Sequence, residues 1–380
     1  MNNHALKQTN IGIIGCGNIS GIYLKNLPTF RDLNVLAVAD LDLERAKAKA
    51  QEYNVAHALS PDELLKRDDI DAVLNITIPV AHADVAMQAL NAGKHVYNEK
   101  PLAVELKDAK AMLDLAKSKG LRVGCAPDTF LGAGLQTSRE LLDVGKVGQP
   151  VHITGFMAYT GPDKWHPDPD FFFKHGAGPL FDMGPYYLTT FVMLLGSVKR
   201  VLASAKTTFA EREVGSGPKQ GQKIKVETPT HIVSMLEFEN GAIGNLTTSF
   251  DMVPGTSPNI EVHGTKGVIT VPDPNTFGGL AGKDVMRWRD DTGWGPESWH
   301  EESVSRPFAE NSRGIGLADM LYAAQENRPH RASGDLAYHV LEIMHKTLES
   351  ARAERPVNIE SRVERPALLE SDYAKGMKKE

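Results

Sequence analysis

Apolar runs of strand length alternate with helix-patterned segments over the first third of this chain, from residue 11 to about residue 125. The runs with the character of strands lie at 11–14, 35–39, 72–76, 95–97 and 121–125. The helix-patterned segments between them lie at 43–53, 80–92 and 106–119. Strand-helix alternation of this length predicts right-handed crossovers between the strands and therefore a parallel sheet.

The chain after Pro127 has a different pattern, which predicts an α+β domain with a large open, mainly antiparallel sheet. The expected helices lie at 135–144, 186–195 and 335–353, and the expected strands lie at 151–159, 232–238, 242–250, 259–262 and 268–271. Asn240-Gly241 stands between two of these strands, where Asn-Gly is a strong hairpin signal. The glycine-rich segment 215–221 is expected to form a mobile loop.

We expect an α/β protein with a first domain at 1–127 and a second at 128–380, because 380 residues are long for one core. The terminal helix packs either within the second domain or back on the first. A net charge of −6 provides no basic field for nucleic acid. Cys16 and Cys125 are too few for a disulfide framework. No signal peptide, membrane span or metal-ligand cluster is found, so a cytoplasmic location is expected.

The segment Gly15-Cys16-Gly17-Asn18-Ile19-Ser20 follows the first strand and opens a helix. In such a fingerprint Gly15 makes the tight turn, and Gly17 lets the backbone approach the pyrophosphate of a dinucleotide. Asp40 ends the second strand, where a carboxylate accepts hydrogen bonds from ribose hydroxyls and repels a 2′-phosphate. NAD is therefore expected, with NADP as the alternative. Asp40 has one other interpretation, as the cap of the following helix, a role that Asp42 fits equally well.

A second motif, Asn98-Glu99-Lys100-Pro101, closes the strand at 95–97. Pro101 restricts the residue before it to extended or turn geometry, so Lys100 is expected at the C-terminal tip of that strand. Ligands of open α/β sheets bind outside the carboxyl ends of the strands. Lys100 is therefore a candidate for chemistry, and the alternative is an exposed lysine without a role.

Together with Thr77-Ile78-Pro79 and His82, these motifs resemble the glucose–fructose oxidoreductase / inositol dehydrogenase (Gfo/Idh/MocA) family. The resemblance implies a Rossmann domain, and an α+β domain whose open sheet mediates homodimers or homotetramers. It also implies oxidation or reduction of a sugar, polyol or cyclitol with NAD or NADP. The implied cofactor contacts are Gly15, Gly17, Asn18, Ile19, Asp40, Thr77, Pro79, His82, Glu99 and Lys100.

In this family an aspartate and a histidine four residues later complete the catalytic site. Asp182 matches the aspartate, but Tyr186 stands at the histidine position. The pKa of free tyrosine is about 10, and a neighbouring ammonium lowers it. We hypothesise that Lys100 and Tyr186 handle the proton while Asp182 orients the lysine or a substrate hydroxyl. The alternatives are Lys100 alone, or a loop histidine, as the base. Asp182 as a helix N-cap and Tyr186 as a packing residue also stay open.

The loop residues Trp165 and His166 are candidates for the substrate pocket, since aromatic faces pack against sugar C–H surfaces. His166 and His175 are the loop histidines that are candidates for the base, and residues 171–173 are expected to anchor the loop in the core. Asp128 follows the last parallel strand, where it either meets a substrate hydroxyl or forms a turn.

Three functions agree with these features. The first is a dehydrogenase for a secondary hydroxyl of a sugar or cyclitol. The second is an NAD-dependent glycosidase that oxidises its substrate transiently, and the third is a non-catalytic nucleotide or sugar sensor. A sensor has no reason to keep Lys100 at the nicotinamide, so an enzyme is favoured.

Overall fold

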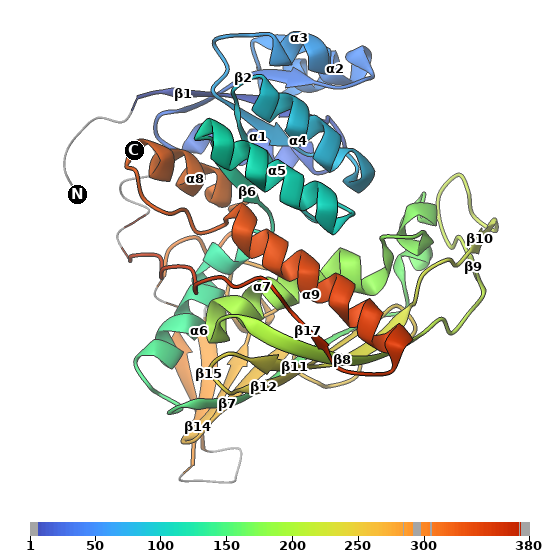
Figure 1. Cartoon of the computed structure of the whole chain (residues 1–380), viewed down its shortest axis with the longest axis vertical. Coiled ribbons are helices and arrows are strands. Elements are labelled where there is room, and N and C mark those ends of the chain that lie inside the picture. Colours follow the sequence, from blue (N-terminus) through green and yellow to red (C-terminus); the bar gives the residue numbers. More distant parts are fainter. Residues whose placement is uncertain (1–6, 284, 292–297, 305, 372, 374–380) are drawn as a thin grey trace. The chain divides into compact units, whose positions relative to one another are not determined.

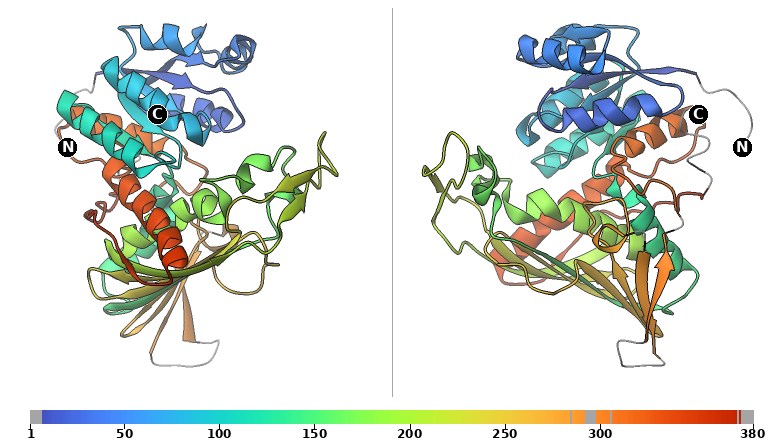
Figure 2. Two further views of the ribbon diagram at one scale, coloured as in Figure 1. Left: turned by 45° about the vertical axis from the view of Figure 1, so that its right-hand side comes forward. Right: turned by 180° about the vertical axis from the view of Figure 1, so that it is seen from behind.

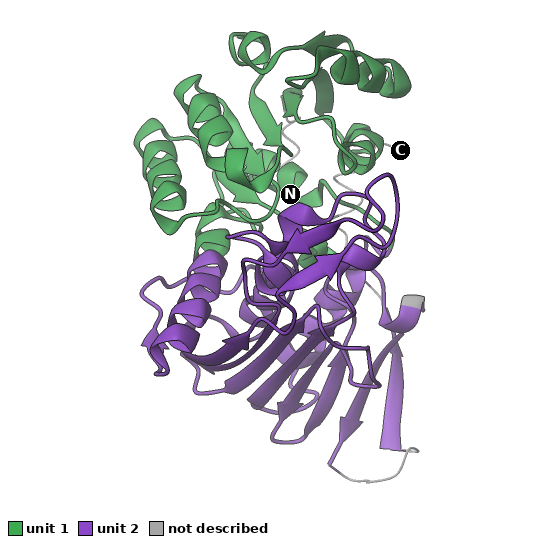
Figure 3. Cartoon of the chain, turned by 90° about the vertical axis from the view of Figure 1, so that its right-hand side faces the viewer, with its two compact units in different colours: residues 1–132, 310–338, 369–380 green, residues 133–309, 339–368 purple. Residues whose placement is uncertain are grey.

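The structure is a computed structural model that describes residues 7–283, 285–291, 298–304, 306–371 and 373. The amino-terminal segment 1–6, where no signal peptide is expected, and residues 374–380 of the charged tail lie outside this description. The chain divides into two compact units (Figure 3). Unit 1 comprises Met1–Gly132, Glu310–Tyr338 and Leu369–Glu380, and unit 2 comprises Ala133–Ala309 and His339–Leu368.

This division differs from the expected boundary between residues 127 and 128. Residues 310–338 belong to unit 1, because helix α8 (Ile315–Gln325) packs against strand β6 (Val123–Cys125) of the first sheet. Helix α9 (Gly334–Ala353), the expected terminal helix, starts in unit 1 and continues in unit 2 from residue 339. The second domain is therefore not one continuous stretch of chain.

Within the described residues, unit 1 contains a parallel sheet of six strands in the order β3-β2-β1-β4-β5-β6 (Figure 1). The other strands are β1 (Thr9–Ile14), β2 (Leu33–Ala39), β3 (His57–Leu59), β4 (Ala72–Asn75) and β5 (His95–Asn98). The other helices are α1 (Ser20–Asn26), α2 (Leu43–Tyr53), α3 (Pro61–Leu65), α4 (His82–Asn91) and α5 (Leu106–Lys119). The strand order turns back at β1, so right-handed crossovers place α1 and α2 on one face and α4 and α5 on the other. The predicted parallel sheet is confirmed.

Unit 2 is built on a mixed sheet in the order β16-β15-β14-β13-β7-β12-β11-β8-β17, in which only β7 and β12 run parallel among the described strands. These strands are β7 (Pro150–Ala158), β8 (Val198–Lys206), β11 (His231–Phe238), β12 (Ile243–Ser249), β13 (Ile260–Gly264), β14 (Gly267–Val271), β15 (Val285–Asp290), β16 (Trp299–Ser303) and β17 (Val357–Asn358). A separate hairpin joins β9 (Glu211–Glu213) to β10 (Lys223–Lys225). The predicted hairpin at Asn240-Gly241 is confirmed between β11 and β12.

Helices α6 (Ala133–Asp143), α7 (Gly178–Leu195) and α9 cover one face of this sheet (Figure 2). Because these helices cover only one face, buried and exposed side chains alternate along β11. Ile232 and Leu236 are buried beneath the helices, whereas Val233 and Met235 on the opposite face are about two-fifths exposed. The expected large open sheet is confirmed. In the part of the chain that the structure describes, every helix is too short or too polar to span a lipid bilayer.

Candidate active site

The glycine-rich turn of unit 1 connects β1 to α1. Gly15 has a φ of 105°, and a Cβ atom on it would lie 2.7 Å from the carbonyl oxygen of Ile76. A Cβ atom on Gly17 would meet no heavy atom within 4 Å, and Asn18 and Ile19 are exposed. The turn is therefore tight against the sheet on one side and open on the other. This arrangement fits a dinucleotide whose pyrophosphate approaches the backbone.

Asp40 follows β2 and is hydrogen-bonded to this turn. Its Oδ2 accepts from the backbone N–H of Cys16 at 2.8 Å, and its Oδ1 accepts from the N–H of Asp42 at 2.9 Å. Asp42, not Asp40, caps α2, because its side chain accepts from the N–H groups of Glu44 and Arg45. The interpretation of Asp40 as the helix cap is therefore wrong. Burial and the Asp40 charge raise the pKa of Cys16 to about 11, so its thiol stays neutral.

Asp40→Asn is expected to weaken the discrimination between NADH and NADPH. The amide keeps one acceptor but loses the charge that repels a 2′-phosphate, and Arg45 lies 3.5 Å from Oδ1. Hydrogen bonds to charged groups contribute about 1.5–3 kcal/mol. The ratio of the NADPH dissociation constant to the NADH dissociation constant should therefore fall about 10- to 100-fold. Fluorescence titrations with both nucleotides measure it. Asp42→Asn is the matched control, and an equal change in that variant contradicts the assignment of Asp40.

Two buried asparagines join the ends of β4 and β5. The Nδ2 of Asn75 donates to Oδ1 of Asn98 and to the carbonyl of His82, both at 3.0 Å. Its Oδ1 accepts from the N–H and the hydroxyl of Thr77. Asn98 in turn donates to the carbonyl of Leu102 at 3.0 Å. Since both amides are fully buried, the network fixes the turns after the two strands.

His82 lies between these turns and is 1% exposed. Its Nδ1 is 2.7 Å from the carbonyl oxygen of Pro101, and its Nε2 is 3.1 Å from that of Thr77. Burial lowers its pKa, whereas the two carbonyl contacts raise it. A neutral ring can donate to only one of these two carbonyls, since it carries a single N–H. The implied direct contact of His82 with the cofactor does not fit this burial. The two contacts fix the ring between the turns that follow β4 and β5. Thr77 and Pro79, in the first of these turns, are half-buried.

Lys100 lies directly after β5, at the strand tip where the sequence placed it, and is half-buried. Glu99 supports it, because its Oε2 accepts from the backbone N–H of Lys100 at 2.9 Å. The Oε1 of Glu99 accepts from the hydroxyl of Tyr23 on α1 at 2.7 Å. Glu99 therefore connects the helix after the glycine-rich turn to the strand tip. The contacts of Glu99 and Lys100 with a nicotinamide stay predictions.

Asp128 is buried, with 1% of its surface exposed. Its Oδ2 accepts from the N–H groups of Gly314 (2.8 Å) and Gly316 (3.0 Å) at the start of α8. Burial raises the pKa of Asp128 to about 6, although these N–H groups lower it. The side chain therefore holds the start of α8, a role that neither the turn nor the substrate interpretation included. The substrate contact of Asp128 stays a prediction.

Asp128→Asn is expected to change how stability depends on pH. The folded chain keeps the proton of Asp128 up to about pH 6, whereas the unfolded chain releases it near pH 4, so wild-type stability falls between these values. A difference of about two pKa units corresponds to about 2–3 kcal/mol. The free energy of unfolding of the variant, relative to wild type, should rise by about this amount from pH 4 to pH 7 in urea titrations. Asp68→Asn, at an exposed position, is the control. If the free energy of unfolding of Asp128→Asn runs parallel to that of the wild type from about pH 4 to pH 7, the expectation is contradicted.

Asp182 and Tyr186 lie in unit 2, one turn apart on α7, and therefore on the same helix face. The helix begins at Gly178, eight residues before the expected start, so Asp182 is in its first turns and is not its N-cap. The N-cap interpretation is wrong. Asp182 is half-buried, and Tyr186 is 8% exposed. The packing interpretation of Tyr186 stays open.

Tyr159 is a further candidate that sequence reasoning missed. Burial raises its pKa, and the charges of Asp182 and Asp163 raise it further. Its hydroxyl therefore keeps its proton and is a poor base. No motif marks Tyr159, which is the last residue of the strand expected at 151–159.

Residues 160–178, here called the aromatic loop, hold the other predicted substrate residues of unit 2. Trp165 is 59% exposed, and its ring centroid lies 5.4 Å from that of His166. His166 also makes edge contacts with the rings at 171 and 172. Phe173 is fully buried as expected, but Phe171 is 51% exposed, so its predicted place in the core is wrong. His175 is exposed on the same loop.

Comparison with known proteins adds to this geometry. Residues 9–126 match the oxidoreductase family with an NAD-binding Rossmann fold, and residues 135–270 match the GFO/IDH/MocA C-terminal domain. The dTDP-3,4-didehydro-2,6-dideoxy-alpha-D-glucose 3-reductase of Streptomyces violaceoruber is 35% identical over 238 residues, 61% of this chain and 67% of the relative. The myo-inositol 2-dehydrogenase of Thermotoga maritima is 27% identical over 260 residues, 68% and 74% of the two chains.

Among solved structures, a levoglucosan dehydrogenase in complex with NADH has a TM-score of 0.78 at 22% identity, over 93% of this chain and 99% of that one. An NAD-binding oxidoreductase from Klebsiella pneumoniae has the same TM-score, identity and coverage. Both share the fold of this chain. The family matches cover both units, and the glycine-rich turn has the geometry that the nucleotide needs. The chain therefore belongs to the GFO/IDH/MocA oxidoreductase family and uses NAD as its cofactor.

Proposed function

We propose that this protein is a dehydrogenase that transfers a hydride between NAD and a secondary hydroxyl of a sugar, sugar derivative or cyclitol. The observation that carries the proposal is Lys100 at the tip of β5, held by Glu99 in the same sheet as the glycine-rich turn. The names of the relatives support the substrate class, since one is a reductase of a dTDP-sugar and another a myo-inositol dehydrogenase.

Bound NAD supplies the hydride acceptor at the nicotinamide. Gly15 and Gly17 shape the turn that receives its pyrophosphate, and Asp40 meets the adenosine ribose. On the substrate, we propose that Lys100 and Tyr186 remove and hold the hydroxyl proton. A group that handles this proton must come within hydrogen-bond reach of the hydroxyl. Asp182 is one turn before Tyr186, which suits it to orient the substrate or the lysine.

We further propose that Trp165 and His166 bind the sugar. Trp165 offers an exposed aromatic face for sugar C–H groups, and the edge of His166 offers a polar group.

A homo-oligomer is also part of the proposal. The open face of the unit 2 sheet exposes Leu202, Val233, Met235 and Ile243 on three neighbouring strands, which is an apolar surface suited to a second copy. Light scattering coupled to size exclusion measures the assembly, and a monomer at micromolar concentration contradicts it.

A screen of sugars and cyclitols with NAD and with NADP tests the proposed activity. Net formation of reduced nicotinamide, together with an oxidised sugar of unchanged carbon skeleton, is the expected result. Cleavage of a glycoside without net NADH contradicts it and favours the glycosidase. Bound NAD that no sugar or cyclitol reduces, even in a single turnover, contradicts both enzymes.

A further inference from the structure

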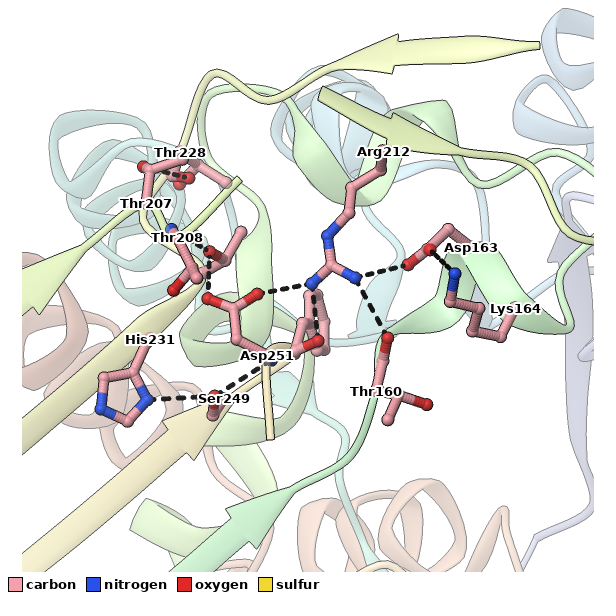
Figure 4. Close-up of polar contacts among 12 residues, drawn as sticks. Thr160, Asp163, Lys164, Thr207, Thr208, Arg212, Thr228, His231, Ser249 and Asp251 are labelled. Carbon is pink, nitrogen blue, oxygen red and sulfur yellow. Dashed lines mark hydrogen bonds and ion pairs between the residues drawn. The ribbon is translucent and has the colours of Figure 1, made fainter. Parts of the chain in front are cut away.

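The aromatic loop is held at its start by a buried arginine of the β9–β10 hairpin, Arg212 (Figure 4). The Nη1 of Arg212 donates to the carbonyl of Thr160 at 3.1 Å, and its Nη2 donates to the carbonyl of Phe250 at 2.6 Å and to Oδ1 of Asp251. The side chains of Arg212 and Asp251 are 8% and 4% exposed. The guanidinium therefore ties the first residue of the loop to the residues that follow β12.

Asp163 makes the loop depend further on this guanidinium. Its side chain is fully buried, and its Oδ1 lies 3.5 Å from Nη1 of Arg212. Within the described residues, neither carboxylate oxygen of Asp163 has a hydrogen-bond partner, and the exposed Lys164 adds an ammonium at 3.5 Å. Since an uncompensated buried charge is costly, Asp163 depends on the charges of Arg212 and Lys164 to keep its place.

The guanidinium also contacts the far part of the loop. Its central carbon lies 5.7 Å from the ring centroid of Phe173 and 5.1 Å from that of Phe209. Phe173 ends the short helical turn Asp170–Phe173 and is fully buried. Arg212 thus lies near two aromatic rings and contacts both the start and the later part of the aromatic loop.

The rest of the hairpin follows the same loop. The N–H of Gly215 donates to the carbonyl of Asp163 at 2.7 Å, and the hydroxyl of Ser216 donates to the carbonyl of Trp165 at 2.9 Å. Lys219 forms an ion pair with Asp168 at 2.7 Å. The glycine-rich segment 215–221 therefore lies along the aromatic loop through one backbone hydrogen bond, one side-chain hydrogen bond and one ion pair.

We propose that Arg212 is a positioning residue for the aromatic loop, and that through this loop it sets the affinity for the sugar. The inference rests on the proposed function, in which Trp165 and His166 bind the substrate. A loop without its anchor must be ordered when the sugar binds, which weakens binding. The proton-handling residues lie outside the loop, so the effect falls on the KM for the sugar and not on kcat.

Arg212→Lys tests the proposal, because lysine keeps a positive charge near Asp163 and Asp251 but lacks the planar set of donors. Hydrogen exchange of the amides at 160–178 should become about tenfold faster, and the KM for the sugar should rise about tenfold, as expected for a loss of ordering. The kcat and the KM for NAD should stay within about twofold. Lys223→Met is the matched control, since Lys223 forms an exposed ion pair with Glu211 on the same hairpin.

Ser216→Ala is a second, milder variant that removes only the hydrogen bond to the carbonyl of Trp165, and it should change both measurements in the same direction. Unchanged exchange in both variants overturns the anchoring, whatever the activity. Faster exchange with an unchanged KM for the sugar overturns the role in sugar binding. If the wild type oxidises no sugar, the proposed function fails, while the exchange measurement still decides the anchoring.

Discussion

Lys100→Met is expected to lower kcat for sugar oxidation by about 10³- to 10⁴-fold, the upper part of the range for a group that transfers or stabilises a proton. Methionine keeps most of the side-chain length but has neither charge nor proton. The backbone contacts of Lys100 with Glu99 remain, so the β5 tip keeps its shape. Steady-state kinetics with the substrate from the screen give kcat, and fluorescence titration gives the NADH dissociation constant, which should change little.

Lys107→Met, on the exposed face of α5, is the matched control and should keep wild-type kinetics. Lys100→Arg separates two roles of the lysine. Arginine keeps the charge but does not release its proton near neutral pH. Activity in Lys100→Arg with none in Lys100→Met therefore indicates an electrostatic role, whereas loss in both indicates proton transfer. If Lys100→Met keeps nearly the wild-type kcat, Lys100 neither transfers the proton nor stabilises charge in the reaction.

The strand-helix alternation of unit 1 was predictable because each long element has its own period and its own start and stop signals. The helix at 43–53 was expected with its observed bounds, since Asp42 caps it and Asn54 ends it in a left-handed conformation. Strand β3 was missed because its three residues, His57–Leu59, form no apolar run. Helix α8 was missed for the opposite reason: residues 315–323 are all buried, so the segment lacks an amphipathic pattern.

The candidate site was predictable where it depends on strand ends and local motifs, as at Asp40 and Lys100. It was not predictable where a side chain meets a distant segment. The carboxylate of Asp128 is bound by N–H groups 186 and 188 residues later in the chain. Arg212 likewise joins positions from 160 to 251, and no short motif marks such a contact. These positions look like ordinary polar residues until the fold brings their partners together.

Tyr186→Phe is expected to lower kcat by about 10³-fold if the tyrosine hydroxyl takes part in proton transfer, the middle of the range for acid–base groups. The change removes one oxygen from a side chain that is 8% exposed, so α7 should keep its packing. The profile of kcat against pH should lose the limb that the wild type owes to this group. The KM for NAD should stay unchanged, because the glycine-rich turn that binds the nucleotide is in unit 1.

Tyr187→Phe is the matched control on the next residue. The hydroxyl of Tyr187 accepts from Nδ2 of Asn259 at 2.9 Å and donates to the carbonyl of Phe156 at 3.3 Å, so its loss should cost stability of about 1 kcal/mol and leave kcat intact. A Tyr186→Phe variant with most of its kcat and an unchanged pH profile assigns Tyr186 to packing. The base is then Lys100 alone or a loop histidine. His166→Gln and His175→Gln separate these cases, because only loss of the true base removes its limb from the profile of kcat against pH.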